Sequence, residues 1–184
     1  YLLELINGIL DLAQIESGKL SLSVEPVSLS EVMLACQAMI EPQALLRGLK
    51  LTFPPADNVS PCFVHADRTR LKQVLINLLS NAIKYNRLGG AVSVDYSPSS
   101  TPGRIRVNIR DTGAGVSPTM LLQLFQPFNR LGQEMGTEEG TGIGLVMSKR
   151  VVELMGGVIG VESNVGVGST FWFEIPLKFN RAEH

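Results

Sequence analysis

The stretch NLLSNAIKYN, residues 77–86, decides the fold because it sets a row of polar side chains into a strongly apolar helical repeat. Asn77, Asn81 and Lys84 are four and three residues apart, so they lie on one face of a helix predicted over 67–86. Asn is a poor helix former, and a buried row of amides needs polar partners. A bound ligand would supply them, because amide oxygens suit Mg²⁺ and a lysine suits a phosphate.

The remaining segments predict an α+β fold, with a largely antiparallel sheet and helices on one of its faces. Apolar periodicity and turn residues predict helices over 1–20, 28–48, 67–86 and 143–156, and a short one near 120–125. Alternation predicts strands over 22–27, 49–55, 62–67, 91–98, 103–111, 158–163 and 169–177. The apolar stripe of 1–20 suggests packing against another helix or a partner chain, and the alternative is packing on its own domain.

Composition excludes several classes of protein. The 184 residues are 45% hydrophobic and 18% charged, which is typical of a globular domain. A net charge of −1 gives no electrostatic case for binding nucleic acid or an anionic membrane. Cys36 and Cys62 lack metal-ligand spacing and are expected to be buried thiols in a reducing compartment. Polar residues interrupt 1–20, so it is neither a membrane span nor a signal segment.

Two glycine-rich motifs are candidates for ligand contacts. In RDTGAGV, residues 110–116, Asp111 ends a predicted strand, and its carboxylate could accept a hydrogen bond from an amino group; the alternative is a plain glycine turn. In EGTGIGL, residues 139–145, three glycines precede a helix, whose N-terminus favours a phosphate. The spacing and context fit neither a dinucleotide fingerprint nor a P-loop. Thr170, in GVGSTFWFEI, is a further candidate contact, although most of that segment reads as a core strand.

In this order, the motifs resemble the ATP-binding domain of the GHKL superfamily, which groups gyrase, heat-shock chaperone, histidine kinase and MutL ATPases. LKQVLINLLSNAIKY resembles the N box, DTGAG the G1 box, LFQPFNR the F box, GTGIGL the G2 box and GVGSTF the G3 element. LDLAQIESGKL resembles the tail of the second dimerisation helix of a sensor histidine kinase. The resemblance covers nearly the whole chain and implies a two-layer α/β sandwich, the Bergerat fold, with an N-terminal helical stub.

For the base of ATP, the resemblance implies five contact residues. Tyr85 would pack on the adenine ring. Asp111 would bind the adenine amino group, helped through water by Thr170. Gly113 and Gly115 would let the backbone approach the nucleotide.

For the phosphates, the resemblance implies a second set. Asn81 would coordinate Mg²⁺, Asn77 would support that site, and Lys84 would contact a phosphate. Arg130, in a lid over 116–140, would reach the γ-phosphate. The start of the last helix would cradle the phosphates with Gly140, Gly142, Gly144 and Leu145.

Asn77 favours a kinase over a hydrolase. The hydrolysing relatives carry a Glu one turn before the Mg²⁺-binding Asn, and an amide cannot act as that general base. We therefore expect a histidine kinase that uses Asn77, Lys84 and Arg130 to position ATP for phosphoryl transfer. The alternatives are a GHKL hydrolase of another class, a serine-kinase anti-sigma factor and a degenerate module that docks signalling proteins.

The resemblance also implies an organisation and partners. We expect the end of a dimerisation helix over 1–20, the catalytic domain over 21–180 and a tail over 181–184. Neither His65 nor His184 has the sequence of a phosphoacceptor, so the acceptor helix is expected upstream and this chain alone should not autophosphorylate. Expected partners are that dimerisation domain and a response regulator or receiver domain. The parent is expected to be a homodimer whose kinase domain lies in the cytoplasm, whether or not the parent is anchored in the inner membrane.

Overall fold

A computed structural model describes residues 2–55, 61–126 and 143–178. Its helices are α1 (Leu2–Glu16), α2 (Leu29–Leu46), α3 (Arg68–Lys84), α4 (Pro118–Leu121) and α5 (Gly144–Leu154). Its strands are β1 (Glu25–Ser28), β2 (Lys50–Thr52), β3 (Phe63–Ala66), β4 (Ala91–Pro98), β5 (Arg104–Asp111), β6 (Val158–Asn164) and β7 (Gly168–Pro176). The predicted elements are confirmed in type and order, with ends that differ by a few residues.

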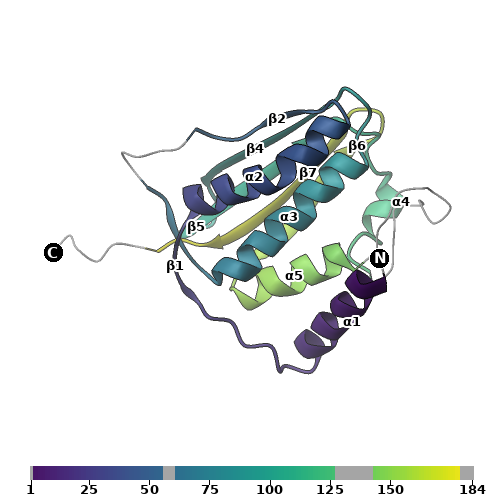
Figure 1. Cartoon of the computed structure of the whole chain (residues 1–184). Helices are drawn as coiled ribbons and strands as arrows, with labels where there is room; N and C mark the ends of the chain where they lie inside the picture. Colours follow the sequence, from purple (N-terminus) through teal and green to yellow (C-terminus); the bar gives the residue numbers. More distant parts are fainter. Residues whose placement is uncertain (1, 56–60, 127–142, 179–184) are drawn as a thin grey trace.

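The main sheet has the strand order β2-β4-β5-β7-β6, and a second, two-stranded sheet pairs β1 with β3. Among the strands of the described residues, β2 pairs in parallel with β4, and the other pairs are antiparallel. Helices α2, α3 and α5 lie together on one face of the main sheet (Figure 1). The expected α+β sandwich, with a mixed but mostly antiparallel sheet, is therefore confirmed.

The core lies between that sheet face and the helices. Alternate residues of β5 and β7 point into it, and α3 adds a continuous apolar surface. The buried apolar side chains of these three elements are Ile105, Val107 and Ile109; Phe171, Phe173 and Ile175; and Leu71, Val74, Leu75, Leu78, Leu79, Ala82 and Ile83. Full burial of one such large side chain contributes about 1.5–3 kcal/mol. This packing fixes α3 on the sheet and leaves the Asn77–Asn81 stripe half-buried.

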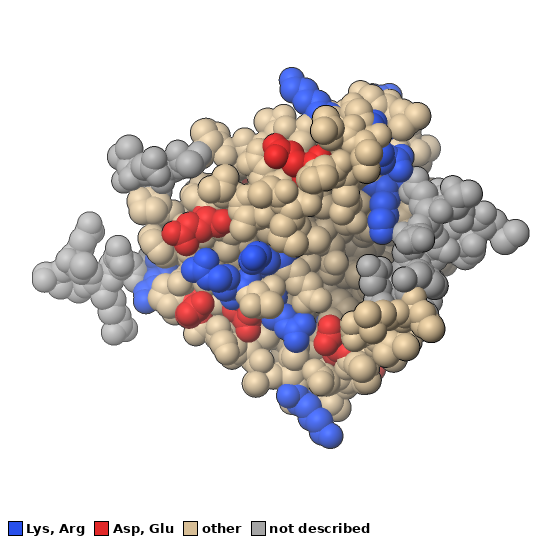
Figure 2. Space-filling model, in the orientation of Figure 1, with Lys and Arg blue, Asp and Glu red and all other residues tan. Residues whose placement is uncertain are grey.

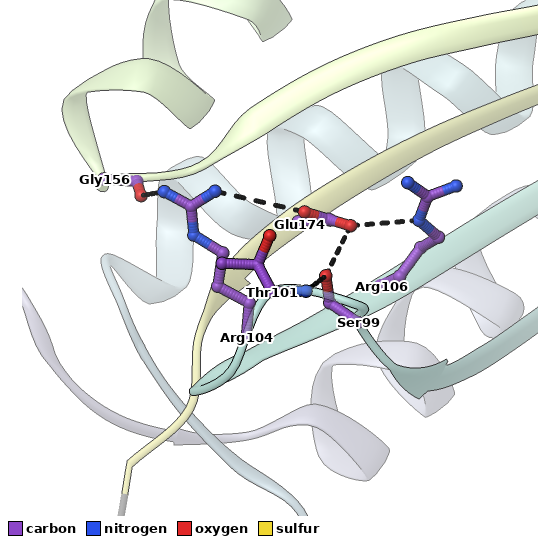
Figure 3. Close-up of polar contacts among 6 residues, drawn as sticks. All are labelled: Ser99, Thr101, Arg104, Arg106, Gly156 and Glu174. Atoms are coloured by element: carbon purple, nitrogen blue, oxygen red, sulfur yellow. Dashed lines mark hydrogen bonds and ion pairs between the residues drawn. The ribbon is translucent and has the colours of Figure 1, made fainter.

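The opposite face of the sheet carries a buried carboxylate at the far end of β5 from Asp111. Glu174 is 3% exposed, and its Oε1 accepts hydrogen bonds from Ser99 Oγ at 2.6 Å and from Arg106 Nε at 3.1 Å (Figure 3). Arg104 lies 4.0 Å from Glu174 Oε2 and donates to the carbonyl of Gly156 at 2.9 Å. A buried carboxylate needs such partners, and here they tie the β4–β5 hairpin to the end of α5.

In the part of the chain that the structure describes, the N-terminal helix packs on its own domain through one face. Ile15 is buried, Asp11 pairs with Arg70 on α3 at 3.9 Å, and Gly8 faces Ile143 at the start of α5. A second set of apolar side chains is exposed: Leu2, Leu3, Ile6, Ile9 and Leu10. Packing on its own domain is therefore confirmed for one face of this helix, whereas packing of the exposed face against a further helix or a partner chain stays a prediction.

Charged side chains are mixed on the helical face of the molecule. Figure 2 shows basic and acidic groups interspersed there, without a broad field of one sign. Arg68, at the start of α3, lies 3.9 Å from Glu25 and 3.5 Å from Glu31.

Candidate functional site

A cavity of about 140 Å³ lies beside the C-terminal end of α3, against the loop that follows β5. It is lined by Asn81, Tyr85, Asp111, Ala114, Gly115, Val116, Ser117, Met120, Ser169 and Phe171. A cavity of roughly 150 Å³ holds a ring the size of benzene. The cavity is therefore of the size for an aromatic ring.

Asp111 ends β5 with its carboxylate at this cavity. Its Oδ1 accepts hydrogen bonds from the backbone N–H groups of Gly113, at 2.9 Å, and Ser169, at 3.3 Å. Burial raises the pKa of Asp111 above its usual value, and these two N–H groups act in the opposite direction. The two backbone donors hold the carboxylate through Oδ1, so Oδ2 is placed to accept a hydrogen bond from a ligand.

The amide stripe of α3 faces the start of α5. Asn77 donates from Nδ2 to Ser148 Oγ at 3.5 Å, and a Cβ on Gly144 would lie 3.7 Å from the Asn77 amide carbon. Asn81, one turn later, lines the cavity. The structure thus brings the stripe beside the N-terminus of α5, where the helix dipole favours an anion.

Lys84 and Tyr85 close the C-terminal end of α3. Lys84 is the only basic residue in the last turn, half-buried, and Tyr85 is the C-cap and lines the cavity. Leu145, in contrast, is buried in the core, so its side chain packs there and only its backbone can face a phosphate. Arg130, Gly140 and Gly142 lie outside the described residues.

The structure does not bring Thr170 to the cavity. In the β5–β7 register Asp111 is paired with Ser169, and Thr170 with Arg110, so Thr170 points to the opposite face of the sheet. Ser169 occupies the place expected for Thr170, and its Oγ lies 2.7 Å from Ser163 Oγ. The sequence held a signal for this difference. Apolar residues alternate along β7, so Phe171 and the other odd-numbered residues of the strand, Ser169 included, face the core.

The cavity also has apolar walls that the motifs did not indicate. Phe171 comes from β7, while Val116 and Met120 come from the loop after β5 and from α4. This loop is held on the β6–β7 turn: Val116 N donates to Ser163 Oγ at 2.7 Å, and Gly166 N donates to Ala114 O at 2.7 Å. An apolar slot with one carboxylate at its end suits a planar base with an amino group.

The fold and this cavity define a class of nucleotide-binding ATPase domains. The family described as histidine kinase-, DNA gyrase B-, and HSP90-like ATPase matches residues 66–179, and the chain belongs to this family.

Within the family, the chain is similar to bacterial sensor kinases. It is 38% identical over 179 residues to the sensor protein GacS of Pseudomonas syringae pv. syringae, covering 96% of this chain and 20% of that protein. It is 42% identical over 177 residues to the circadian input-output histidine kinase CikA of Synechococcus elongatus, covering 96% of this chain and 23% of that protein. The chain thus spans about a fifth of the length of these relatives.

Two solved structures extend the similarity to the fold. Full-length ShkA in complex with AMPPNP has a TM-score of 0.82 and 30% identity, over 98% of this chain and 37% of that one. The histidine kinase ThkA in complex with the response regulator TrrA has a TM-score of 0.69 and 26% identity, over 95% of this chain and 48% of that one. The chain therefore corresponds to the catalytic domain of a sensor histidine kinase.

The described residues contain neither a candidate membrane helix nor a cluster of metal-binding side chains. No helix in residues 2–55, 61–126 and 143–178 has the length and apolarity needed to cross a membrane. The same ranges hold no group of three or more His, Cys, Asp or Glu side chains that could bind a metal ion.

Proposed function

We propose that this chain binds Mg-ATP and transfers the γ-phosphoryl group to a histidine of a dimerisation domain, for relay to an aspartate of a response regulator. One observation carries the proposal: Asp111, Tyr85 and Asn81 line one cavity, next to the N-terminus of α5. That arrangement supplies a contact for a base and a polar stripe for phosphates. The ATP analogue in the ShkA complex supports the same reading.

Asp111 would recognise the base. Adenine offers an amino N–H at the position where the guanine ring carries a carbonyl oxygen. A carboxylate accepts from the first and repels the second, so the cavity selects adenine. Tyr85 and Phe171 would pack on the ring.

Asn81 would hold the metal. Its amide oxygen is a hard ligand, and Mg²⁺ is often bound by one or two protein groups together with the substrate phosphates. A bound Mg²⁺ would neutralise charge on the phosphates during transfer. Asn77 would support this site from one turn away, and Lys84 would contact a phosphate as a point charge.

The amide at Asn77 favours transfer over hydrolysis. In the transfer step a nitrogen of the acceptor imidazole bonds to the γ-phosphorus, the bond from that phosphorus to the bridging oxygen breaks, and ADP leaves. Water would compete if a general base activated it, but the Asn77 amide is neutral and donates to Ser148 Oγ. We expect ATP to persist in the site until the histidine arrives.

The partners follow from the same proposal. The exposed apolar face of α1 suits the helices of a homodimeric dimerisation domain. A response regulator partner is supported by the ThkA–TrrA complex. We place the domain in the cytoplasm, where ATP and the regulator are found.

Calorimetric titration with ADP, and incubation with labelled ATP, test this function. We expect ADP to bind, binding to tighten with Mg²⁺, and labelled ATP to give neither rapid hydrolysis nor stable phosphohistidine on this chain alone. Rapid turnover would support a hydrolase instead. Absence of any nucleotide binding would support a docking module.

Replacing Gly113 with Ala should weaken ADP binding about tenfold or more, as expected when a buried hydrogen bond is lost. A Cβ at this position would lie 2.5 Å from the carbonyl oxygen of Tyr85 and 3.1 Å from Asp111 Oδ1, so the loop must move away from both. Calorimetry measures the effect. Gly8→Ala is the matched control, because its Cβ meets Ile143 at an ordinary 3.5 Å; equal affinities for the two variants would contradict the prediction.

A further inference from the structure

Asn86 is a buried amide that the proposed mechanism does not use. It follows Tyr85 directly, is 6% exposed, and forms three hydrogen bonds through its side chain. Its Nδ2 donates to the carbonyl of Ala91 at 2.9 Å. Its Oδ1 accepts from the backbone N–H of Arg87 at 2.9 Å and from the hydroxyl of Thr112 at 3.0 Å.

The partners fix the orientation of this amide. The Arg87 N–H can only donate and the Ala91 carbonyl can only accept, so the Asn86 oxygen and nitrogen cannot exchange places. Thr112 completes the network, because its Oγ1 also accepts from the backbone N–H of Ala91 at 2.9 Å. Each buried polar group in this cluster has a partner, which makes the cluster rigid.

The network joins the two walls of the cavity. Asn86 is the neighbour of Tyr85 on one wall, and Thr112 is the neighbour of Asp111 on the other. The network itself is closely packed, since a Cβ on Gly90 would lie 2.5 Å from both Asn86 Oδ1 and Thr112 Oγ1. The hydrogen bond from Thr112 Oγ1 to Asn86 Oδ1 therefore connects the chain segment that carries Tyr85 to the segment that carries Asp111.

We infer that Asn86 and Thr112 are positioning residues that set the separation between Tyr85 and Asp111, and thereby the selectivity for adenine. The inference rests on the proposed function. A small displacement of Asp111 lengthens its hydrogen bond to the base, and displacements of about 1 Å have large effects on such geometry. Contacts with the phosphates come from Asn81, Lys84 and α5, and do not depend on this network.

The test compares affinities for Mg-ADP and Mg-IDP, because inosine carries a carbonyl where adenosine carries its amino group. Thr112→Val and Asn86→Asp keep the shape of the side chains, but the first removes the hydroxyl and the second faces the Ala91 carbonyl with a carboxylate oxygen. We expect both variants to lose tenfold or more in ADP affinity, which is the size of effect expected for loss of one buried hydrogen bond to the base. Their IDP affinity should stay within about twofold of the wild type, because IDP lacks the amino group that makes this bond. Thr112→Ser keeps the hydroxyl and should keep the selectivity.

Ser99→Ala is the matched control. It removes a part-buried hydrogen bond that is also donated by a side-chain hydroxyl, to Glu174, at the opposite end of the sheet, and should leave the ADP-to-IDP ratio unchanged. A folded Thr112→Val variant with an unchanged ratio, or with both affinities reduced equally, would overturn the inference. If Asn86→Asp does not fold, the Thr112→Val and Thr112→Ser pair decides. A wild type that binds no ADP would instead contradict the proposed function.

Discussion

Replacing Asp111 with Asn should lower the affinity for ATP about a hundredfold or more while the domain stays folded. The backbone N–H groups of Gly113 and Ser169 both point at Oδ1. If the amide oxygen of the variant meets them, its NH₂ group faces the amino group of adenine; if the amide turns, its NH₂ meets the two backbone donors. Either orientation leaves buried donors unpaired, at about 1–3 kcal/mol for each group. Calorimetry with Mg-ATP measures the loss.

Asp95→Asn is the control for this variant. Asp95 also belongs to a strand of the main sheet, but its side chain is 46% exposed and pairs with Arg110 and Asn108 on the open face. Its replacement should leave nucleotide affinity unchanged. If Asp111→Asn also bound ATP like the wild type, the base would not be recognised by this carboxylate.

Affinity should also depend on pH through Asp111. In the proposed site the nucleotide would bind the ionised carboxylate. Burial raises the pKa of Asp111, so affinity should be complete above the raised pKa and should be lost as the pH falls through it. The loss should begin at a higher pH than it would for an exposed aspartate. Asp111→Asn should lack this acidic limb, which a titration series in pH can show.

Replacing Asn81 with Ala should abolish the effect of Mg²⁺ on nucleotide binding. We expect Mg²⁺ to tighten ADP binding by the wild type. In the variant, the affinity of the nucleotide complex for Mg²⁺ should fall about a hundredfold, since loss of even an indirect metal contact often costs 10–100-fold in metal affinity. In the presence of EDTA the variant and the wild type should bind ADP alike, because the base contacts remain. Calorimetry with and without Mg²⁺ separates the contribution of the metal to ADP binding from the contribution of the base contacts.

Gln73 provides the matched control on the same stripe of α3. It is an amide two turns before Asn81, is half-buried, and accepts a hydrogen bond from Arg70 at 2.9 Å. Gln73→Ala should keep the Mg²⁺ increment, since Gln73 does not line the cavity. A Mg²⁺ increment that survives in Asn81→Ala would show that the metal is held elsewhere.

Local patterns in the sequence were enough to predict the helices and strands, and to predict which residues of α3 and β5 belong to the candidate site. Apolar spacing predicted α3 and put Asn77, Asn81 and Lys84 on one face, because helical geometry has a fixed period. Alternation predicted β5 and its terminal Asp111 in the same way. The resemblance added the roles of these residues, which patterns alone left open.

Contacts between distant segments needed the tertiary structure. Thr170 and Ser169 are adjacent in the chain, and the antiparallel register between β5 and β7 decides that Ser169 lies beside Asp111. A shift of one residue would exchange them, because successive strand residues face opposite sides of a sheet. Likewise, Asn86 and Thr112 are 26 residues apart, and only the packing of the loops brings their side chains together.

The sequence by itself determined the chemistry available at the stripe: amides at Asn77 and Asn81, without a carboxylate to activate water. The tertiary structure alone decided what that stripe faces, since the Asn77 amide meets Ser148 on α5 across 71 residues of chain. The physical reason is range. Backbone geometry sets which side chains of one element share a face, whereas the burial of apolar faces against one another sets which elements meet.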